Sequence, residues 1–257
     1  MIKHIKWELD DYLNLSIFAF GFILLGVTLH VQALKGGPSF TVSPPEPEKL
    51  LHNSIIAMGI SLPRLEGDSF IILALTGTLL ASLILRYEKD SRVAMSIYSL
   101  PTKNCELVGA KIISGLILLI LATIIPHFLA SVYTYGDSPN LLKAALIDEG
   151  FLGLYVVYWF LASFYIIAVA SFVAELSPNT FASILGGILV FYLPLVFNLS
   201  YLPPEILNKS FLIAVAKGTG AVNRLLLFLK STFIPCLLVP MISIVLTLLA
   251  GEWRDVR

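Results

Sequence analysis

The sequence predicts an all-α membrane protein, and two observations support this prediction. The chain of 257 residues is 57% hydrophobic and only 13% charged, with a mean hydropathy of +0.88, whereas soluble domains carry about 25% charged residues. The charged residues are gathered between long uncharged stretches. Because a charge at the centre of a bilayer costs about 2.5–3.5 kcal/mol on insertion scales, this pattern indicates alternating membrane and water-exposed segments. It excludes a soluble globular enzyme.

Six stretches contain no Asp, Glu, Lys or Arg and have 17 to 24 residues. A helix that rises 1.5 Å per residue needs roughly 20 residues to cross a ~30 Å hydrocarbon core. Each stretch is therefore predicted to be one transmembrane helix of a single domain that covers residues 1–257. The predicted spans are residues 12–31, 69–85, 112–133, 151–174, 180–199 and 231–250.

A short amphipathic helix is predicted before the first span. Apolar side chains recur there at steps of three and four residues, with charged side chains on the other face, which is typical of a helix lying in the membrane interface. The apolar positions are Ile2, Ile5, Leu9 and Leu13, and the charged ones are Lys3, Lys6 and Asp10. A frayed terminus with accidental periodicity is the alternative.

The basic residues of the connections predict the orientation. The densest short cluster of Lys and Arg lies between the second and third spans, in residues 86–111, and short basic connections face the cytoplasm. We therefore expect a multi-pass protein of the plasma membrane with both termini in the cytoplasm. Residues 32–68, 134–150 and 200–230 are then the outer connections.

The last outer connection contains two short apolar runs, the second over residues 225–229, around Gly218-Thr219-Gly220. Two half-helices of this kind can dip into the membrane and return where protein shields the irregular backbone. The sequence thus predicts a re-entrant-like hairpin before the sixth span, with Gly218 and Gly220 in a possible external gate. A surface hairpin of interfacial helices is the alternative.

Sequence motifs of enzymes are missing. The chain has no phosphate-binding Gly-x-x-x-x-Gly-Lys-Ser/Thr, no His-Glu-x-x-His, no Gly-x-Ser-x-Gly and no paired carboxylates within a span. We therefore expect no catalytic, metal-binding or cofactor-binding residues. The 17 basic and 17 acidic residues balance, so nothing in the net charge indicates a nucleic-acid partner.

An aromatic group in the fourth span is a candidate part of a translocation path. Tyr155, Tyr158 and Trp159 lie within five residues of one another. Such a group either contacts a cargo or a partner, or serves helix packing and the membrane interface.

The connection between the second and third spans is the most informative segment. It predicts two short helices joined at Pro101, because proline disfavours helical geometry in the residue before it. Ile97 belongs to an apolar stripe on the first helix, beside Glu88 and Arg92. An amphipathic helix at the membrane surface suits docking on a soluble partner, and a plain solvated loop is the alternative.

Three features of this connection follow one another along the chain. Glu88 is an acidic residue before a short helix, Ser99-Leu100-Pro101 is a Ser/Thr-x-Pro turn, and Gly109-Ala110-Lys111 leads into the third span. In this order they resemble the intracellular loop of permease subunits of the type-2 ABC exporters. The family often has Gly-Thr shortly after the acidic residue, where this chain has Asp90-Ser91-Arg92. Six spans, an amphipathic helix before the first, and a hairpin before the sixth are similar to that family's plan as well.

The resemblance implies a permease subunit that pairs within the membrane lipid with a second permease, either another copy (a homodimer) or a related chain (a heterodimer), and exports a substrate. A separate ATP-binding cassette ATPase chain would hold ATP and Mg and drive it. The uncharged spans favour an apolar or amphipathic substrate. The ATPase-coupling residues that the resemblance implies are Glu88, Arg92, Ile97, Ser99, Pro101 and Lys111. The alternative is a non-transporting polytopic assembly or anchoring subunit, for which six uncharged spans would suffice.

Overall fold

The computed structural model describes residues 2–35, 47–90, 104–218 and 220–254. Helices form this part of the chain, and the described residues contain no strand. Three π-helical turns, η1 to η3, adjoin the α-helices. In chain order the elements are α1 (Ile2–Asp10), α2 (Tyr12–Lys35), α3 (Pro47–Ser61), α4 (Gly67–Ser82), η1 (Leu83–Tyr87), α5 (Glu88–Asp90), α7 (Asn104–Tyr135), α8 (Pro139–Lys143), η2 (Ala144–Asp148), α9 (Phe151–Leu176), α10 (Thr180–Val196), α11 (Glu205–Lys217), α12 (Ala221–Phe233), η3 (Ile234–Leu238) and α13 (Val239–Arg254).

Within the described residues, five helical segments are long and apolar enough to cross a membrane. They are α2, α4 with η1, α7, α9, and the segment that joins α12, η3 and α13. The predicted class, an all-α protein with several membrane-spanning helices, is thus confirmed. The remaining predicted span, residues 180–199, corresponds to α10, whose 17 residues extend only about 25 Å.

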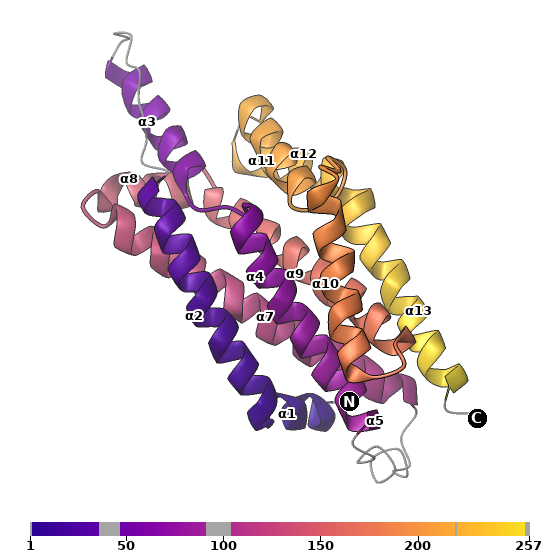
Figure 1. Cartoon of the computed structure of the whole chain (residues 1–257). Coiled ribbons are helices and arrows are strands. Elements are labelled where there is room, and N and C mark those ends of the chain that lie inside the picture. Colours follow the sequence, from indigo (N-terminus) through magenta and orange to yellow (C-terminus); the bar gives the residue numbers. More distant parts are fainter. Residues whose placement is uncertain (1, 36–46, 91–103, 219, 255–257) are drawn as a thin grey trace.

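The long helices run side by side in one bundle (Figure 1). α1, α5 and the last turn of α13 lie at one end of the bundle, which we call the terminal end. α3, α8 and the α11–α12 hairpin lie at the other, which we call the hairpin end. The described elements of the predicted inner and outer connections therefore lie at opposite ends of the bundle.

α4 and α9 form the centre of the bundle. In the most apolar stretch of each of these helices, 67% is buried within the protein, compared with 22% for α2 and 17% for the last spanning segment. α4 packs against α2, α7, α9 and α10. The peripheral helices expose large apolar side chains such as Ile23 and Val27 of α2, and a continuous apolar surface of this kind marks contact with a membrane.

Glycine residues let α4 and its neighbours come close together. A Cβ atom on Gly77 would lie 2.4 Å from Cγ2 of Ile166 on α9, and one on Gly187 of α10 would lie 2.4 Å from Cγ2 of Thr78. In lipid, helices associate through van der Waals packing, so small residues at the crossings allow the close approach that holds the bundle together.

The last spanning segment is longer than predicted. The sequence predicts a half-helix over residues 225–229 separate from the span 231–250, but α12, η3 and α13 follow one another without a break. The two hydroxyl residues at the start of the predicted span, Ser231 and Thr232, form hydrogen bonds within the helix. The Ser231 hydroxyl donates to the Phe228 carbonyl at 2.9 Å, and the Thr232 hydroxyl donates to the same carbonyl at 2.8 Å. Bonds of this kind let Ser and Thr remain inside a membrane helix.

The close approach of α4 and α9 can be tested with Gly77→Ala. The added methyl group would overlap the Ile166 side chain, so we expect the free energy of unfolding in detergent to fall by about 1–3 kcal/mol. The control is Gly153→Ala on α9, where a Cβ atom would meet open space. Because alanine favours helix over glycine, the control should be neutral or more stable by up to about 1 kcal/mol. Equal stability of the two variants would contradict this account of the packing.

Candidate functional site

Six charged side chains form three ion pairs at the terminal end, next to the helices that flank the 91–103 connection. The described pairs there are Glu8–Lys111, Lys89–Glu175 and Arg86–Asp90. We call these six residues the terminal-end network. It is a candidate site for docking and coupling, because it joins the helices on both sides of the connection to the rest of the bundle.

Lys111 lies in the third turn of α7 and is almost completely buried. Its Nζ atom lies 3.3 Å from Oε1 of Glu8 on α1 and donates to the Ile84 carbonyl of η1 at 2.8 Å. A charge taken out of water needs a partner and further hydrogen bonds to offset its desolvation. Lys111 therefore joins α1, α7 and η1 at one point.

The turn between α1 and α2 is closed by a side-chain amide. Nδ2 of Asn14 donates to the Glu8 carbonyl at 3.0 Å and lies 3.4 Å from its carboxylate oxygen Oε2. α1 is thus a formed helix held against α7, while Ile2 and Trp7 stay exposed. The predicted N-terminal helix is present, and it packs on the bundle through a buried carboxylate.

Lys89 connects α5 with the end of α9. Its Nζ atom lies 2.7 Å from Oε1 of Glu175, whose side chain is 1% exposed. Glu175 is the penultimate residue of α9, so this pair fixes the short helix α5 to one of the two central helices of the bundle.

Asp90 connects α5 with the beginning of α10. Its Oδ2 atom accepts hydrogen bonds from the backbone N–H and from the hydroxyl of Thr180, both at 2.6 Å. Nε of Arg86 lies 3.2 Å from the other carboxylate oxygen, and the same guanidinium donates to the Pro178 carbonyl. Desolvation raises the pKa of Asp90, but the Thr180 hydrogen bonds and the Arg86 charge outweigh it and hold the pKa below its usual value.

Only part of the predicted coupling loop can be compared with this geometry. Lys111 belongs to the terminal-end network, and the backbone of Glu88 lies in α5. The Glu88 side chain lies outside the described residues, and so do Arg92, Ile97, Ser99 and Pro101. Their predicted role in coupling stays a prediction.

Sequence reasoning missed most of the terminal-end network. Glu8 lies within one helical turn of Ile5 and Leu9, so a carboxylate interrupts the apolar side of the first helix. Lys111 is equally isolated, since it stands between the apolar residues Ala110 and Ile112. Two opposite charges at such positions indicate a buried pair. Glu175 offered no comparable signal, because an acidic residue at the end of a span also fits plain exposure to water.

The predicted aromatic group is buried at the hairpin end. Tyr155, Tyr158 and Trp159 have no exposed surface. The Tyr155 hydroxyl lies 3.0 Å from the Gly59 carbonyl of α3, and the Tyr158 hydroxyl donates to Oδ1 of Asn208 on α11 at 2.7 Å. Packing within one chain, one of the two alternatives, accounts for these contacts. A role in a translocation path stays a prediction.

The two glycines of the hairpin have different roles. Gly220 has φ +79° and ψ 163°, a backbone conformation almost restricted to glycine. A Cβ atom on Gly218 would lie 2.5 Å from Cγ of Arg224 and from the Ala214 carbonyl. Gly220 is thus required for the turn and Gly218 for close packing. Whether the hairpin gates a path stays a prediction.

Arg224, which the sequence analysis did not single out, fixes the hairpin to the bundle. Its buried guanidinium lies 2.8 Å from Oε2 of Glu149 through Nη1 and 3.3 Å from the Gly218 carbonyl through Nε. Glu149 also lies 3.2 Å from Nδ1 of His52 on α3. One carboxylate therefore joins α3, the start of α9 and α12.

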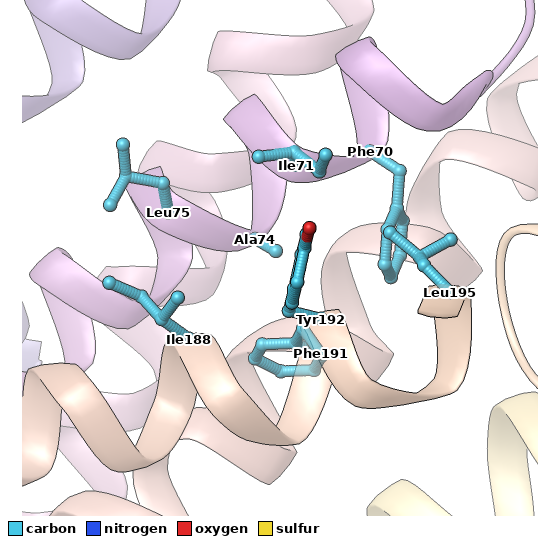
Figure 2. Close-up of a pocket in the computed structure, with 8 residues that line it drawn as sticks. All are labelled: Phe70, Ile71, Ala74, Leu75, Ile188, Phe191, Tyr192 and Leu195. Carbon is cyan, nitrogen blue, oxygen red and sulfur yellow. The ribbon is translucent and has the colours of Figure 1, made fainter. Parts of the chain in front are cut away.

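An apolar pocket lies between α4 and α10 (Figure 2). It has a volume of about 230 Å³. Its walls are Phe70, Ile71, Ala74, Leu75, Ile188, Phe191, Tyr192 and Leu195. Figure 2 shows the Tyr192 ring pointing toward α4, so its hydroxyl is the polar group in an otherwise apolar lining.

The buried pair can be tested with Lys111→Met. This change leaves Glu8 buried without the lysine, so we expect a loss of about 3–5 kcal/mol in the free energy of unfolding. The double variant Glu8→Leu/Lys111→Met removes both charges and should recover part of that loss. Unfolding in detergent measures both effects. Losses that simply add in the double variant would show that the two side chains do not interact.

The Asp90 contacts predict an acid dependence. A carboxylate with a lowered folded-state pKa contributes stability above its unfolded pKa, near 3.9, and this contribution is lost as the pH falls through the folded pKa. The difference in melting temperature between the wild type and Asp90→Asn should therefore be full at pH 5–7 and shrink below about pH 4. A constant difference across this range would contradict the assignment.

Comparison of the chain with known protein families, characterised proteins and solved structures finds no match.

Proposed function

We propose that the chain is the membrane-spanning permease subunit of an ABC exporter, driven by a separate ATPase chain that docks at the terminal end. The observation that carries this proposal is the terminal-end network. α5 and α7, which flank the 91–103 connection, are tied by buried or partly buried ion pairs to α1 and α9, and by Asp90 to the start of α10. A partner that moves this connection would act on all of these helices together.

The proposal includes six membrane crossings. α9 runs from the hairpin end to the terminal end, and α12–α13 later runs in the same direction (Figure 1). Between them, α10 therefore has to bring the chain back to the hairpin end. The 17 residues of α10 are sufficient where the helix meets a locally thinned bilayer. Both ends of the chain then face the cytoplasm of a plasma-membrane protein, together with the basic 86–111 connection.

Coupling would proceed through differential affinity. ATP favours the closed form of the ATPase chains, and the permease follows because its two states bind the closed and open ATPase with different affinities. ATP and Mg bind in the partner, and this chain supplies the mechanical connection. Lys89 and Lys111 make that connection stiff, since each is held by a carboxylate within the bundle.

The proposed cargo is apolar or amphipathic. The pocket between α4 and α10 is lined by apolar side chains and one tyrosine, a lining that suits apolar ligands oriented by a single polar group. α10 lies at the periphery and exposes Leu185, Leu189 and Tyr192. In a pair of permease copies, this surface would lie beside a path between them, and the hairpin would close the path from outside.

The experiment compares Lys89→Glu with Lys143→Glu in vesicles that contain the chain and its ATPase. The first change replaces the ammonium group that lies 2.7 Å from Oε1 of Glu175 with a carboxylate, so we expect it to abolish transport while the ATPase still hydrolyses ATP. The control makes the same change on exposed Lys143 of α8, at the hairpin end, and should leave transport unchanged.

Two outcomes would contradict the proposal. Normal coupled transport by Lys89→Glu would remove the terminal-end network from the mechanism. If no ATP-binding cassette ATPase co-purifies with the chain, the non-transporting assembly or anchoring subunit becomes the better interpretation.

A further inference from the structure

We propose that the groove between α2 and α7 binds one membrane phospholipid, with an acyl chain in the groove and the ester or phosphate oxygens at His30 and Tyr133. The groove has a volume of about 550 Å³. It follows both helices within their membrane-spanning parts, and it is separate from the pocket between α4 and α10. No step of the proposed transport function uses it.

The register of the two helices produces the groove. Phe22, Gly26 and His30 follow one another at steps of four residues, so they form one stripe on α2. Pro126 and Tyr133 mark the matching stripe on α7. The stripe from Phe22 to His30 is about 12 Å long at 1.5 Å per residue, and it runs along the helices, as the acyl chains of the surrounding bilayer do.

Small residues make the floor of the groove. A Cβ atom on Gly26 would lie 3.7 Å from Cβ of Pro126, with no other atom within 4 Å. Pro126 and Ala130 are buried beneath it, whereas Val27 of α2 and Leu129 of α7 are 60% and 58% exposed and form the walls. The missing side chain at Gly26 therefore leaves a hollow that opens toward the surrounding lipid.

The groove is polar only at the end near the hairpin end of the bundle. The rings of His30 and Tyr133 meet edge to face, with centroids 4.7 Å apart. Both belong to the groove lining and lie in the last two turns of α2 and the last turn of α7. An imidazole and a phenol supply N–H and O–H donors at the level where lipid ester and phosphate oxygens lie. An apolar trough with donors at its interfacial end matches a phospholipid along its length.

The close packing of α2 and α7 favours a lipid chain over a protein helix in the groove. A helix with its side chains is about 10–12 Å across. α2 and α7 already pack closely along their length, so a third helix would rest on Val27 and Leu129 and leave the floor unfilled. An acyl chain is narrow enough to reach Gly26, and filling the floor recovers the van der Waals contacts that an empty hollow would lose.

The test uses the full chain in detergent, stripped of lipid and titrated with dioleoylphosphatidylglycerol, with native mass spectrometry as the readout. Gly26→Leu fills the floor with a side chain that meets only ordinary contact at its Cβ atom. The matched control is Gly153→Leu on α9, where the Cβ atom meets open space. We expect the wild type and Gly153→Leu to retain one tightly bound phospholipid per chain, and Gly26→Leu to lose it.

A second variant keeps the proposal testable if Gly26→Leu does not fold. Tyr133→Phe removes a donor from an exposed position and should weaken phospholipid retention without filling the groove. Equal retention by the wild type, Gly26→Leu and Tyr133→Phe would overturn the proposal. So would a Gly26→Leu variant that changes from dimer to monomer with an unchanged lipid count, because a second copy would then occupy the groove. The assay contains no ATPase and measures no transport, so its failure would leave the proposed function untouched.

Discussion

The rest of the structure depends on the close packing of α4 at the centre of the bundle. Within a membrane, water cannot drive apolar helices together, so the helices must fit closely enough for dispersion contacts to hold them. Gly77 meets Ile166 of α9, and Gly21 of α2 meets Thr76. The Thr76 hydroxyl donates to the Ile72 carbonyl within α4, so its polar group is satisfied and its methyl group is free to pack against Gly21.

This packed centre leaves the charged side chains to the two ends, where they fasten connecting segments. At the terminal end, Glu175 and Lys111 hold α5 and α1 against the long helices. At the hairpin end, Arg224 and Glu149 hold α12 and α3 against the start of α9. A buried ion pair contributes little net stability compared with apolar packing, but removing one partner leaves the other charge buried without it. The pairs therefore specify where each connection docks more than they stabilise the bundle.

The sequence predicted the fold class and most helix positions because uncharged length is a direct consequence of bilayer thickness. It placed Gly220 between two apolar runs, and the structure gives this glycine a positive φ of 79°. It did not predict that Tyr155 and Tyr158 hold α11 and the segment before α4. The sequence pattern of a tyrosine in a span is the same whether its side chain faces lipid, a translocation path or a neighbouring carbonyl. Most of the terminal-end network was missed for a related reason: Lys89–Glu175 and Glu8–Lys111 join residues more than 80 positions apart, and no local pattern shows which residues pair over such a distance.

α9 is the element that joins the two ends. Tyr155 and Tyr158 hold the segments around α3, α4 and α11 at the hairpin end, and Glu175 holds α5 at the terminal end. Twenty residues of continuous helix separate Tyr155 from Glu175, which is about 30 Å at 1.5 Å per residue. α9 is packed on several sides by α4, α7, α10 and α13, so bending it would disrupt these contacts. In the proposed transporter, a displacement of α5 by a docked ATPase would therefore reach the outer hairpin through α9, and Arg224 and Asn208 are the contacts that would have to rearrange for the hairpin to open.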